Sequence, residues 1–305
     1  MLKLYVEDLK PMIREKYIDL HTHTTFSDGT YTPYELVREA KEKNLSAIAI
    51  TDHDCVDGIE EGLRTGEELG VEVISGIEFA TNYTDIKNLD ETEIHIVGLF
   101  LDYKNPCLLE IIQRLKNERN ERNITMSKKL TDLGFPITFK ELMEEAGVGT
   151  CTRAHYANLM VKKGYIGHKK EAFHKYIGSG KPGYVPRTLP TPKECIDIIK
   201  KSGGVAILAH ATLYGMDVNQ IRIMAKNLKE LDLKGMEIMY STYMPQQEKE
   251  LTQLASDLEL LPSGGSDFHG SNKPDIFLGV GRGNLRIPYE FLENLRKEKQ
   301  KHLKL

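Results

Sequence analysis

Histidine and acidic side chains occur at the ends of several short apolar runs of this chain, or within them. Neutral imidazoles suit Zn, Fe and Mn, whereas carboxylates favour Mn or Mg and can bridge two ions. A set of nine exceeds what one four- to six-coordinate ion can use, so the sequence predicts two or three divalent ions. The candidate metal ligands are His21, His23, Asp28, His53, Glu78, His95, His210, Asp267 and His269.

The apolar runs themselves are predicted strands, and helical patterns separate most of them. This alternation is typical of βα units around a parallel sheet. The carboxyl ends of parallel strands face one side, so the candidate ligands should meet on one rim. His21 and His23, two residues apart on an extended chain, should point the same way. The predicted strands cover residues 17–20, 47–51, 71–74, 94–100, 206–209 and 235–239, with a last run at 260–267.

Two capping signals and one change of composition divide the chain. Thr32-Pro33-Tyr34-Glu35 and Thr191-Pro192-Lys193-Glu194 each predict the start of a helix. Helical patterns without comparable strand signals then run from residue 106 to about 177, and residues 178–190 carry the Gly and Pro content of a connection. We therefore predict one α/β domain, residues 1–102 and 191–305, interrupted by a helical insertion domain, residues 103–190.

Composition excludes several classes of protein. The 305 residues are 40% apolar and 28% charged, as in ordinary globular proteins. A net charge of -4 argues against broad capture of double-stranded DNA and leaves a small nucleotide or a short single-stranded end. No apolar stretch approaches the ~18 residues of a membrane span, and the N-terminus lacks an apolar leader, so we expect a cytoplasmic protein.

Single residues of the candidate site also have simpler interpretations. His95 and His210 could be strand histidines with hydrogen-bond partners, and Asp28 could only stabilise its own turn. The combination favours a metal site, because six of the ten histidines lie at or within predicted strands beside small or acidic residues.

Six motifs resemble those of the PHP superfamily of polymerase and histidinol phosphatase domains. Within it, S-D-G in the first motif and the helical insertion look like the branch of nucleoside 3',5'-bisphosphate phosphatases and related 5'-to-3' exoribonucleases. The resemblance implies a distorted βα (TIM-like) barrel with a trinuclear site, often manganese, although Zn, Fe or Mg remain open. The motifs are D-L-H-T-H-T-T-F-S-D-G-T (19–30), T-D-H-D (51–54), G-I-E (76–78), E-I-H-I-V-G (93–98), L-A-H (208–210) and G-S-D-F-H-G (265–270).

The resemblance also implies how the ligands divide among the ions. His21, His23, Glu78 and Asp267 would hold one metal, Asp28, His53 and His269 a second, and Glu78 with His95 and His210 a third. Two positions depart from the family pattern, because Ala154 and Ala211 stand where prolines are usual.

Substrate residues are expected in the insertion. Thr152-Arg153-Ala154-His155 resembles the family's R-P-H segment, and Arg153 would hold a phosphate that does not react through its planar fork. His155 is a candidate general acid, and Lys181 and Arg187 are further basic candidates.

Together these features predict a metal-dependent phosphoesterase that uses metal-activated hydroxide and no protein nucleophile. The expected substrate is the 3'-phosphate of a nucleoside 3',5'-bisphosphate, or the 5'-phosphorylated end of a short RNA. A phosphatase of another small ester, such as histidinol phosphate, and a noncatalytic metal-binding module are the alternatives. Oligomeric state is left open.

Overall fold

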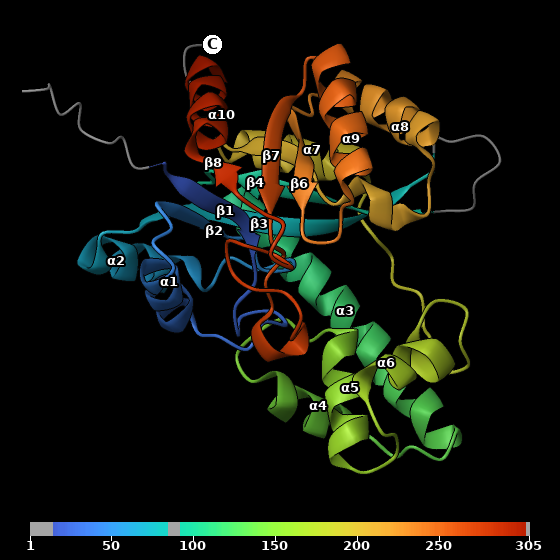
Figure 1. The fold of residues 1–305 in the computed structure, drawn as a ribbon. Coiled ribbons are helices and arrows are strands. Elements are labelled where there is room, and N and C mark those ends of the chain that lie inside the picture. The colour runs from blue at the N-terminus through green and yellow to red at the C-terminus, as the bar shows by residue number, and fades with distance from the viewer. Residues whose placement is uncertain (1–14, 85–91, 303–305) are drawn as a thin grey trace, which may run out of the picture.

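The computed structural model describes residues 15–84 and 92–302, which form an α/β barrel with a lobe of helices beside it (Figure 1). The N-terminal segment, which is expected to lack an apolar leader, lies largely outside these ranges. The strands of the described residues make one sheet in the order β7-β6-β5-β4-β3-β2-β1-β8. The strands are β1 Tyr17–Thr22, β2 Ala47–Ile50, β3 Glu72–Tyr83, β4 Thr92–Leu99, β5 Val205–Leu208, β6 Gly235–Tyr240, β7 Leu261–Gly265 and β8 Ile287–Pro288.

The sheet nearly closes on itself beyond β7. The amide of Asp267 donates to the carbonyl oxygen of His21 at 2.9 Å, and the amide of His23 donates to the carbonyl oxygen of Phe268 at 3.0 Å. These bonds join the segment after β7 to the end of β1, and thereby bring the first and last motifs together. The predicted TIM-like barrel is confirmed.

The prediction of a parallel sheet is wrong at β4, which runs antiparallel to both β3 and β5. β3 is also much longer than the predicted run at 71–74 and extends to Tyr83. A parallel return would need a crossover of a dozen or more residues. The stretch between Tyr83 and Thr92 is shorter than that, so the chain returns antiparallel. His95 therefore pairs with Ala80 across the two strands, close to Glu78.

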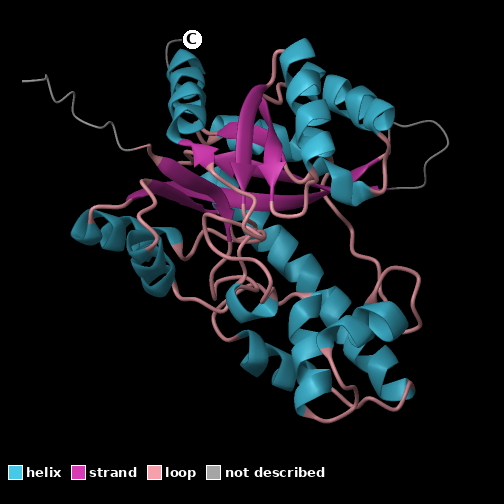
Figure 2. Cartoon of the chain, in the orientation of Figure 1, coloured by secondary structure: helices cyan, strands magenta, loops and turns pink. Residues whose placement is uncertain are grey.

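Helices cover the outside of the sheet and close one end of the barrel (Figure 2). The predicted caps are present, because the Thr32 and Thr191 side chains accept from the amides of Glu35 and Glu194. None of the helices in the described ranges combines the length and apolar character needed to cross a membrane. The helices that cover the sheet are α1 Pro33–Glu42, α2 Ile59–Leu69, α7 Pro192–Lys201, α8 Val218–Glu230, α9 Pro245–Asp257 and α10 Tyr289–His302.

The helical lobe follows β4 and has a hydrophobic core of its own. Its longest member, α3 (Pro106–Asp132), contributes Leu108 and Leu115 to the main core and Met126 and Leu130 to the core of the lobe. The same helix thus belongs to both units, and the division at residues 103 and 190 stays a prediction. The other members are α4 Phe139–Ala146, α5 Arg153–Lys162, α6 Lys169–Ala172 and the π-helix η1 Phe173–Ile177.

Gly265 at the end of β7 lets the closing segment approach β1. A Cβ atom at this position would lie 2.2 Å from Cβ of His21 and 2.7 Å from its backbone nitrogen. We expect Gly265→Ala to lower the free energy of unfolding by about 1 to 3 kcal/mol, the usual cost of overpacking a core. Urea denaturation would measure the loss.

Gly167→Ala is the matched control, because an added Cβ there meets only a carboxylate oxygen of Glu171 at 3.9 Å. Equal unfolding midpoints for the two variants would contradict this account of how the barrel closes.

Candidate metal centre and substrate pocket

The Glu78 carboxylate lies at the centre of the candidate ligands and is 1% exposed. Its Oε1 atom is 2.7 Å from Nδ1 of His95 and 2.9 Å from Nε2 of His210. Its Oε2 atom is 3.0 Å from Nδ1 of His53 and 3.2 Å from Nε2 of both His21 and His23. One carboxylate from β3 therefore contacts imidazoles from four other segments of the barrel.

Several buried nitrogen and oxygen atoms of the candidate ligands lie within ion-pair distance of one another but lack the angles of a regular hydrogen bond. Atoms from different candidate ligands come within 4.8 Å of one another in overlapping groups, as expected for ligands around more than one cation. The described residues therefore fit a set of divalent ions. The buried atoms without a regular hydrogen bond include Nε2 of His21 and His23, Nδ1 of His210, Oδ1 of Asp28 and Oε2 of Glu78. The groups are His23, Asp28, His53 and His269; His21, Glu78 and His210; His21, His23 and Asp267; and His53, Glu78 and His95.

Without metal, protons carry the positive charge of this cluster. Burial lowers the pKa of His23, but hydrogen bonding to Asp267 and Glu78 outweighs burial and raises it to about 9. The same competition, with Glu78 dominant, raises the pKa of His95 to about 10. Burial prevails at His53 and lowers its pKa to about 3. Binding of a cation must therefore displace protons from some ligands but not from others.

Side chains behind the candidate ligands fix the orientation of those ligands. Glu237 of β6 accepts from Nδ1 of His21 at 2.8 Å and from the amide of His210 at 2.6 Å. The first bond sets the tautomer of His21 so that its Nε2 atom, which faces the cluster, is free to bind metal. The Tyr240 hydroxyl donates to Oδ2 of Asp267 at 2.6 Å, which leaves Oδ1 facing His23 at 3.2 Å.

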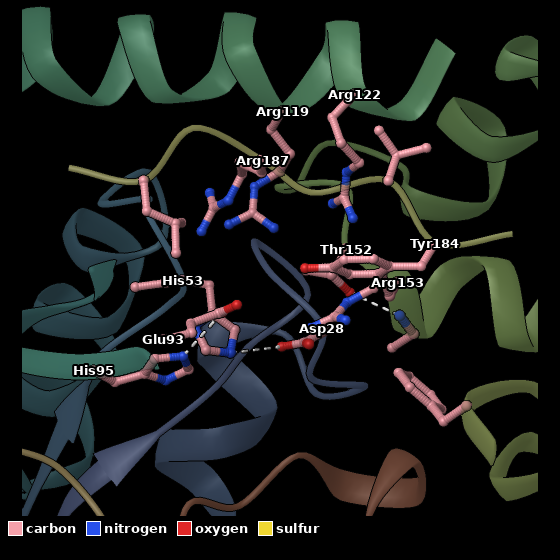
Figure 3. Close-up of a pocket in the computed structure, with 15 residues that line it drawn as sticks. Asp28, His53, Glu93, His95, Arg119, Arg122, Thr152, Arg153, Tyr184 and Arg187 are labelled. Carbon is pink, nitrogen blue, oxygen red and sulfur yellow. Dashed lines mark hydrogen bonds and ion pairs between the residues drawn. The ribbon is translucent and has the colours of Figure 1, made fainter. Parts of the chain in front are cut away.

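A pocket beside the cluster has two unlike walls (Figure 3). The candidate metal ligands Asp28, His53 and His95 line one side, together with Glu93. The pocket is also lined by four arginines of the described residues, which we call the arginine cluster. In Figure 3, Arg119, Arg122 and Arg187 lie opposite His53 and His95, and Arg153 lies between Tyr184 and Asp28. Its members are Arg119 and Arg122 from α3, Arg153 at the start of α5, and Arg187 from the return segment, residues 178–190.

Arg122 and Arg153 form no ion pair within 4.0 Å with a carboxylate of the described residues, although the charge of Arg153 helps to lower the pKa of Glu93, which lines the same pocket. Burial and the neighbouring arginines lower the pKa of Arg122 to about 9, and its Nε atom has no hydrogen-bond partner among the described residues. The Arg153 guanidinium lies over the Tyr184 ring, 5.5 Å from its centroid. Buried charges are costly unless paired, so this wall is suited to an anion that enters the pocket.

Comparison with known proteins identifies the family. A family model described as PHP domain matches residues 19–172. The chain belongs to the PHP domain family. The Rnm 5'-3' exoribonuclease of Escherichia coli is 34% identical to it, over 87% of this chain and 88% of that protein.

Two further comparisons agree. The 3',5'-nucleoside bisphosphate phosphatase of Chromobacterium violaceum is 28% identical, over 83% of this chain and 87% of that protein. A solved structure from Bifidobacterium adolescentis, assigned as a metal-dependent phosphoesterase, has a TM-score of 0.80 and 28% identity, and covers 92% of this chain and 95% of that one. The predicted family and the predicted class of enzyme, a phosphoesterase, are confirmed.

The predicted site residues of this PHP domain protein do not all lie at the pocket. The candidate ligands occupy one rim, and the groups His21, His23 and Asp267 and His23, Asp28, His53 and His269 agree with the first two predicted sets. Glu78 contacts both His95 and His210, as in the third set. The division among ions stays a prediction. Arg153 and Arg187 line the pocket, while Lys181 does not.

His155 is also absent from the residues that line the pocket. Its buried Nδ1 atom accepts from the Thr152 amide at 3.0 Å and so caps α5. Burial lowers its pKa. Its role as a proton donor stays a prediction.

Arg119 and Arg122 were not predicted, although the sequence contains a signal for them. The buried face of α3 runs through Leu108, Ile112 and Leu115, then through these two arginines, and resumes at Met126. Steps of three and four residues continue through the arginines, so both occupy positions where an apolar residue is expected. A charged residue on an apolar stripe indicates a specific role, and both arginines line the pocket.

The central carboxylate leads to a prediction about metal content. Glu78→Gln removes the negative charge that the surrounding imidazoles share, so we expect fewer bound ions and a fall in kcat of at least ~100-fold. Elemental analysis of protein prepared with manganese should find more than one ion per chain in the wild type and fewer in the variant.

His174→Ala is the control, because this exposed histidine of η1 is remote from the donor groups. One ion or fewer in a fully active wild-type protein would refute the multinuclear site.

Proposed function

We propose that this PHP domain protein hydrolyses the bond between a phosphate and the 3' oxygen of a nucleotide that also carries a 5'-phosphate. The supporting observation is the pocket itself, which is lined both by candidate metal ligands and by the arginine cluster. A substrate with one anionic group could be held by the metal centre alone. Two walls that both attract anions fit a substrate with two phosphates.

One geometry serves two kinds of substrate. In a nucleoside 3',5'-bisphosphate the 3'-phosphate is terminal, and in RNA the same phosphate continues to the next nucleotide. With the 5'-phosphate held by the arginine cluster, the same P–O3' bond lies toward the metal centre in both cases. This proposal is consistent with relatives that include both an exoribonuclease and a bisphosphate phosphatase.

The residues of the two walls have distinct roles in this reaction. Divalent metals supply Lewis acidity and lower the pKa of water at such a centre. Glu237 and Tyr240 hold His21 and Asp267 in the orientation that metal binding requires. Arg122 and Arg153 would bind the phosphate that does not react and place the 3' ester against the ligands, which raises the effective concentration of the reacting groups.

Manganese is the metal that we propose, because the donor set mixes imidazoles with carboxylates. We further propose that the enzyme acts in the cytoplasm on small nucleotides or single-stranded RNA ends. A pocket with buried arginines admits a chain end more readily than the side of a duplex, and the net charge of -4 offers no broad attraction for double-stranded DNA.

Substrate preference tests the proposal directly. Manganese-loaded protein should release phosphate from adenosine 3',5'-bisphosphate and mononucleotides from 5'-phosphorylated short RNA. It should act much more slowly on the same RNA with a 5'-hydroxyl, because the arginine cluster then has no anion to bind. The measurement is kcat/KM for each substrate.

Two outcomes would favour the alternatives. A preference for histidinol phosphate would indicate a different small ester as the substrate. Full metal occupancy without hydrolysis of any of these compounds would indicate a noncatalytic metal-binding module.

Arg153 provides a sharper test of the second phosphate. Its loss should cost about 2 to 4 kcal/mol of transition-state binding for the bisphosphate, the scale of a charge-assisted contact in a desolvated site. For Arg153→Ala, the ratio of kcat/KM for adenosine 3',5'-bisphosphate to that for 4-nitrophenyl phosphate should therefore fall roughly 30- to 800-fold.

Arg222→Ala on α8 is the control, because that arginine pairs with Asp257 on the surface. An equal loss on both substrates would instead place Arg153 in the chemical step or in folding.

A further inference from the structure

Asp54 follows the metal ligand His53 and is fixed to the strand that carries Glu78. Its amide donates to the carbonyl oxygen of Glu78 at 3.1 Å, and its backbone has a φ of +49°. Its side chain is 1% exposed. The carboxylate is therefore held by the backbone of the metal rim, yet Asp54 belongs to none of the groups of candidate ligands.

The Asp54 side chain contacts two members of the arginine cluster. Its Oδ2 atom accepts from Nη2 of Arg119 on α3 and, at 2.7 Å, from Nη1 of Arg187 in the return segment. These partners are 65 and 133 residues away in the sequence. The barrel rim, α3 and the return segment thus meet at a single oxygen atom.

The charges around Asp54 explain what this contact achieves. The buried Asp54 carboxylate lies between the guanidinium groups of Arg119 and Arg187 and accepts a hydrogen bond from each. Without that charge, two buried guanidinium groups would repel each other and lose their shared acceptor. Asp54 pairs with Arg119 and Arg187 and not with Arg122, whose Nε atom has no hydrogen-bond partner among the described residues and is available to a ligand.

We propose that Asp54 is a positioning residue for the site of the second phosphate. It fixes Arg119 and Arg187 relative to the metal centre, so that the arginine cluster presents its donors at the distance from the metals that the substrate requires. Asp54 does not touch substrate and acts through the two arginines. This inference rests on the proposed function, which it extends from the arginines that would bind the second phosphate to the residue that fixes the other two arginines of the same cluster.

Asparagine is the appropriate replacement. The substitution Asp54→Asn keeps the size of the side chain, and asparagine tolerates a positive φ better than most residues, whereas alanine would add backbone strain. The amide removes the charge that aligns both guanidinium groups. Asp257→Asn is the matched control, because Asp257 pairs with Arg222 at 2.9 Å on the surface.

The first measurement separates binding from chemistry. For Asp54→Asn, the ratio of kcat/KM for adenosine 3',5'-bisphosphate to that for 4-nitrophenyl phosphate should fall about 10- to 100-fold, mainly through a higher KM for the bisphosphate. Calorimetry should show that adenosine 5'-monophosphate binds the metal-loaded variant about tenfold more weakly. Both quantities should stay at wild-type values in Asp257→Asn.

The second measurement tests whether Asp54 acts through its partners. In an Arg187→Met background, the additional effect of Asp54→Asn on the ratio should be clearly smaller than in the wild type, because one of the two aligned groups is already gone. A purely structural role would give independent effects that multiply.

The outcomes distinguish this inference from the proposed function. If the wild-type protein fails to prefer the bisphosphate over 4-nitrophenyl phosphate, the proposed function fails. If the wild type shows the preference but Asp54→Asn lowers kcat on both substrates equally, or leaves the ratio and the affinity for adenosine 5'-monophosphate intact, the positioning role of Asp54 is overturned.

Discussion

The buried carboxylate of Glu78 is the constraint on which the rest of the structure depends. A charge that is 1% exposed is costly to desolvate unless opposite charge surrounds it. The neighbouring imidazoles supply that charge when protonated, and divalent ions supply it when they bind. Burial alone would raise the pKa of Glu78, but neighbouring imidazoles, among them His21 and His95, hold it well below its usual range. The fold is therefore built to keep this carboxylate ionised and ready to bind cations.

The topology of the barrel follows from the need to surround Glu78. The long β3 places it in mid-strand, and the antiparallel β4 returns His95 to its side. Closure of the sheet after β7 adds Asp267, whose amide donates to the carbonyl oxygen of His21 in β1. Gly265 permits this closure because the two backbones nearly touch there. A site built from segments this distant in sequence depends on the whole barrel for its geometry.

The sequence predicts the metal centre much better than the pocket beside it. Candidate ligands such as His23 and His53 follow strands, so local patterns indicate both their chemistry and the side they face. The antiparallel direction of β4 follows from the short length of chain after Tyr83, which is too short for a parallel crossover. Glu237 looked like an ordinary strand residue, because its partners His21 and His210 become neighbours only in the folded barrel. Contacts between distant segments have no local signature.

The position of the arginine cluster depends on the continuity of α3. Its first turns are anchored by Leu108 and Leu115 in the main core, and its last turns by Met126 and Leu130 in the core of the lobe. Arg119 and Arg122 lie between these anchors, three residues apart and hence on one face. A helix held at both ends cannot shift its middle independently, so the arginines keep a fixed distance from the barrel. The lobe therefore contributes recognition without loosening the geometry of the metal centre, because the helix that carries the arginines is also part of the barrel's own core.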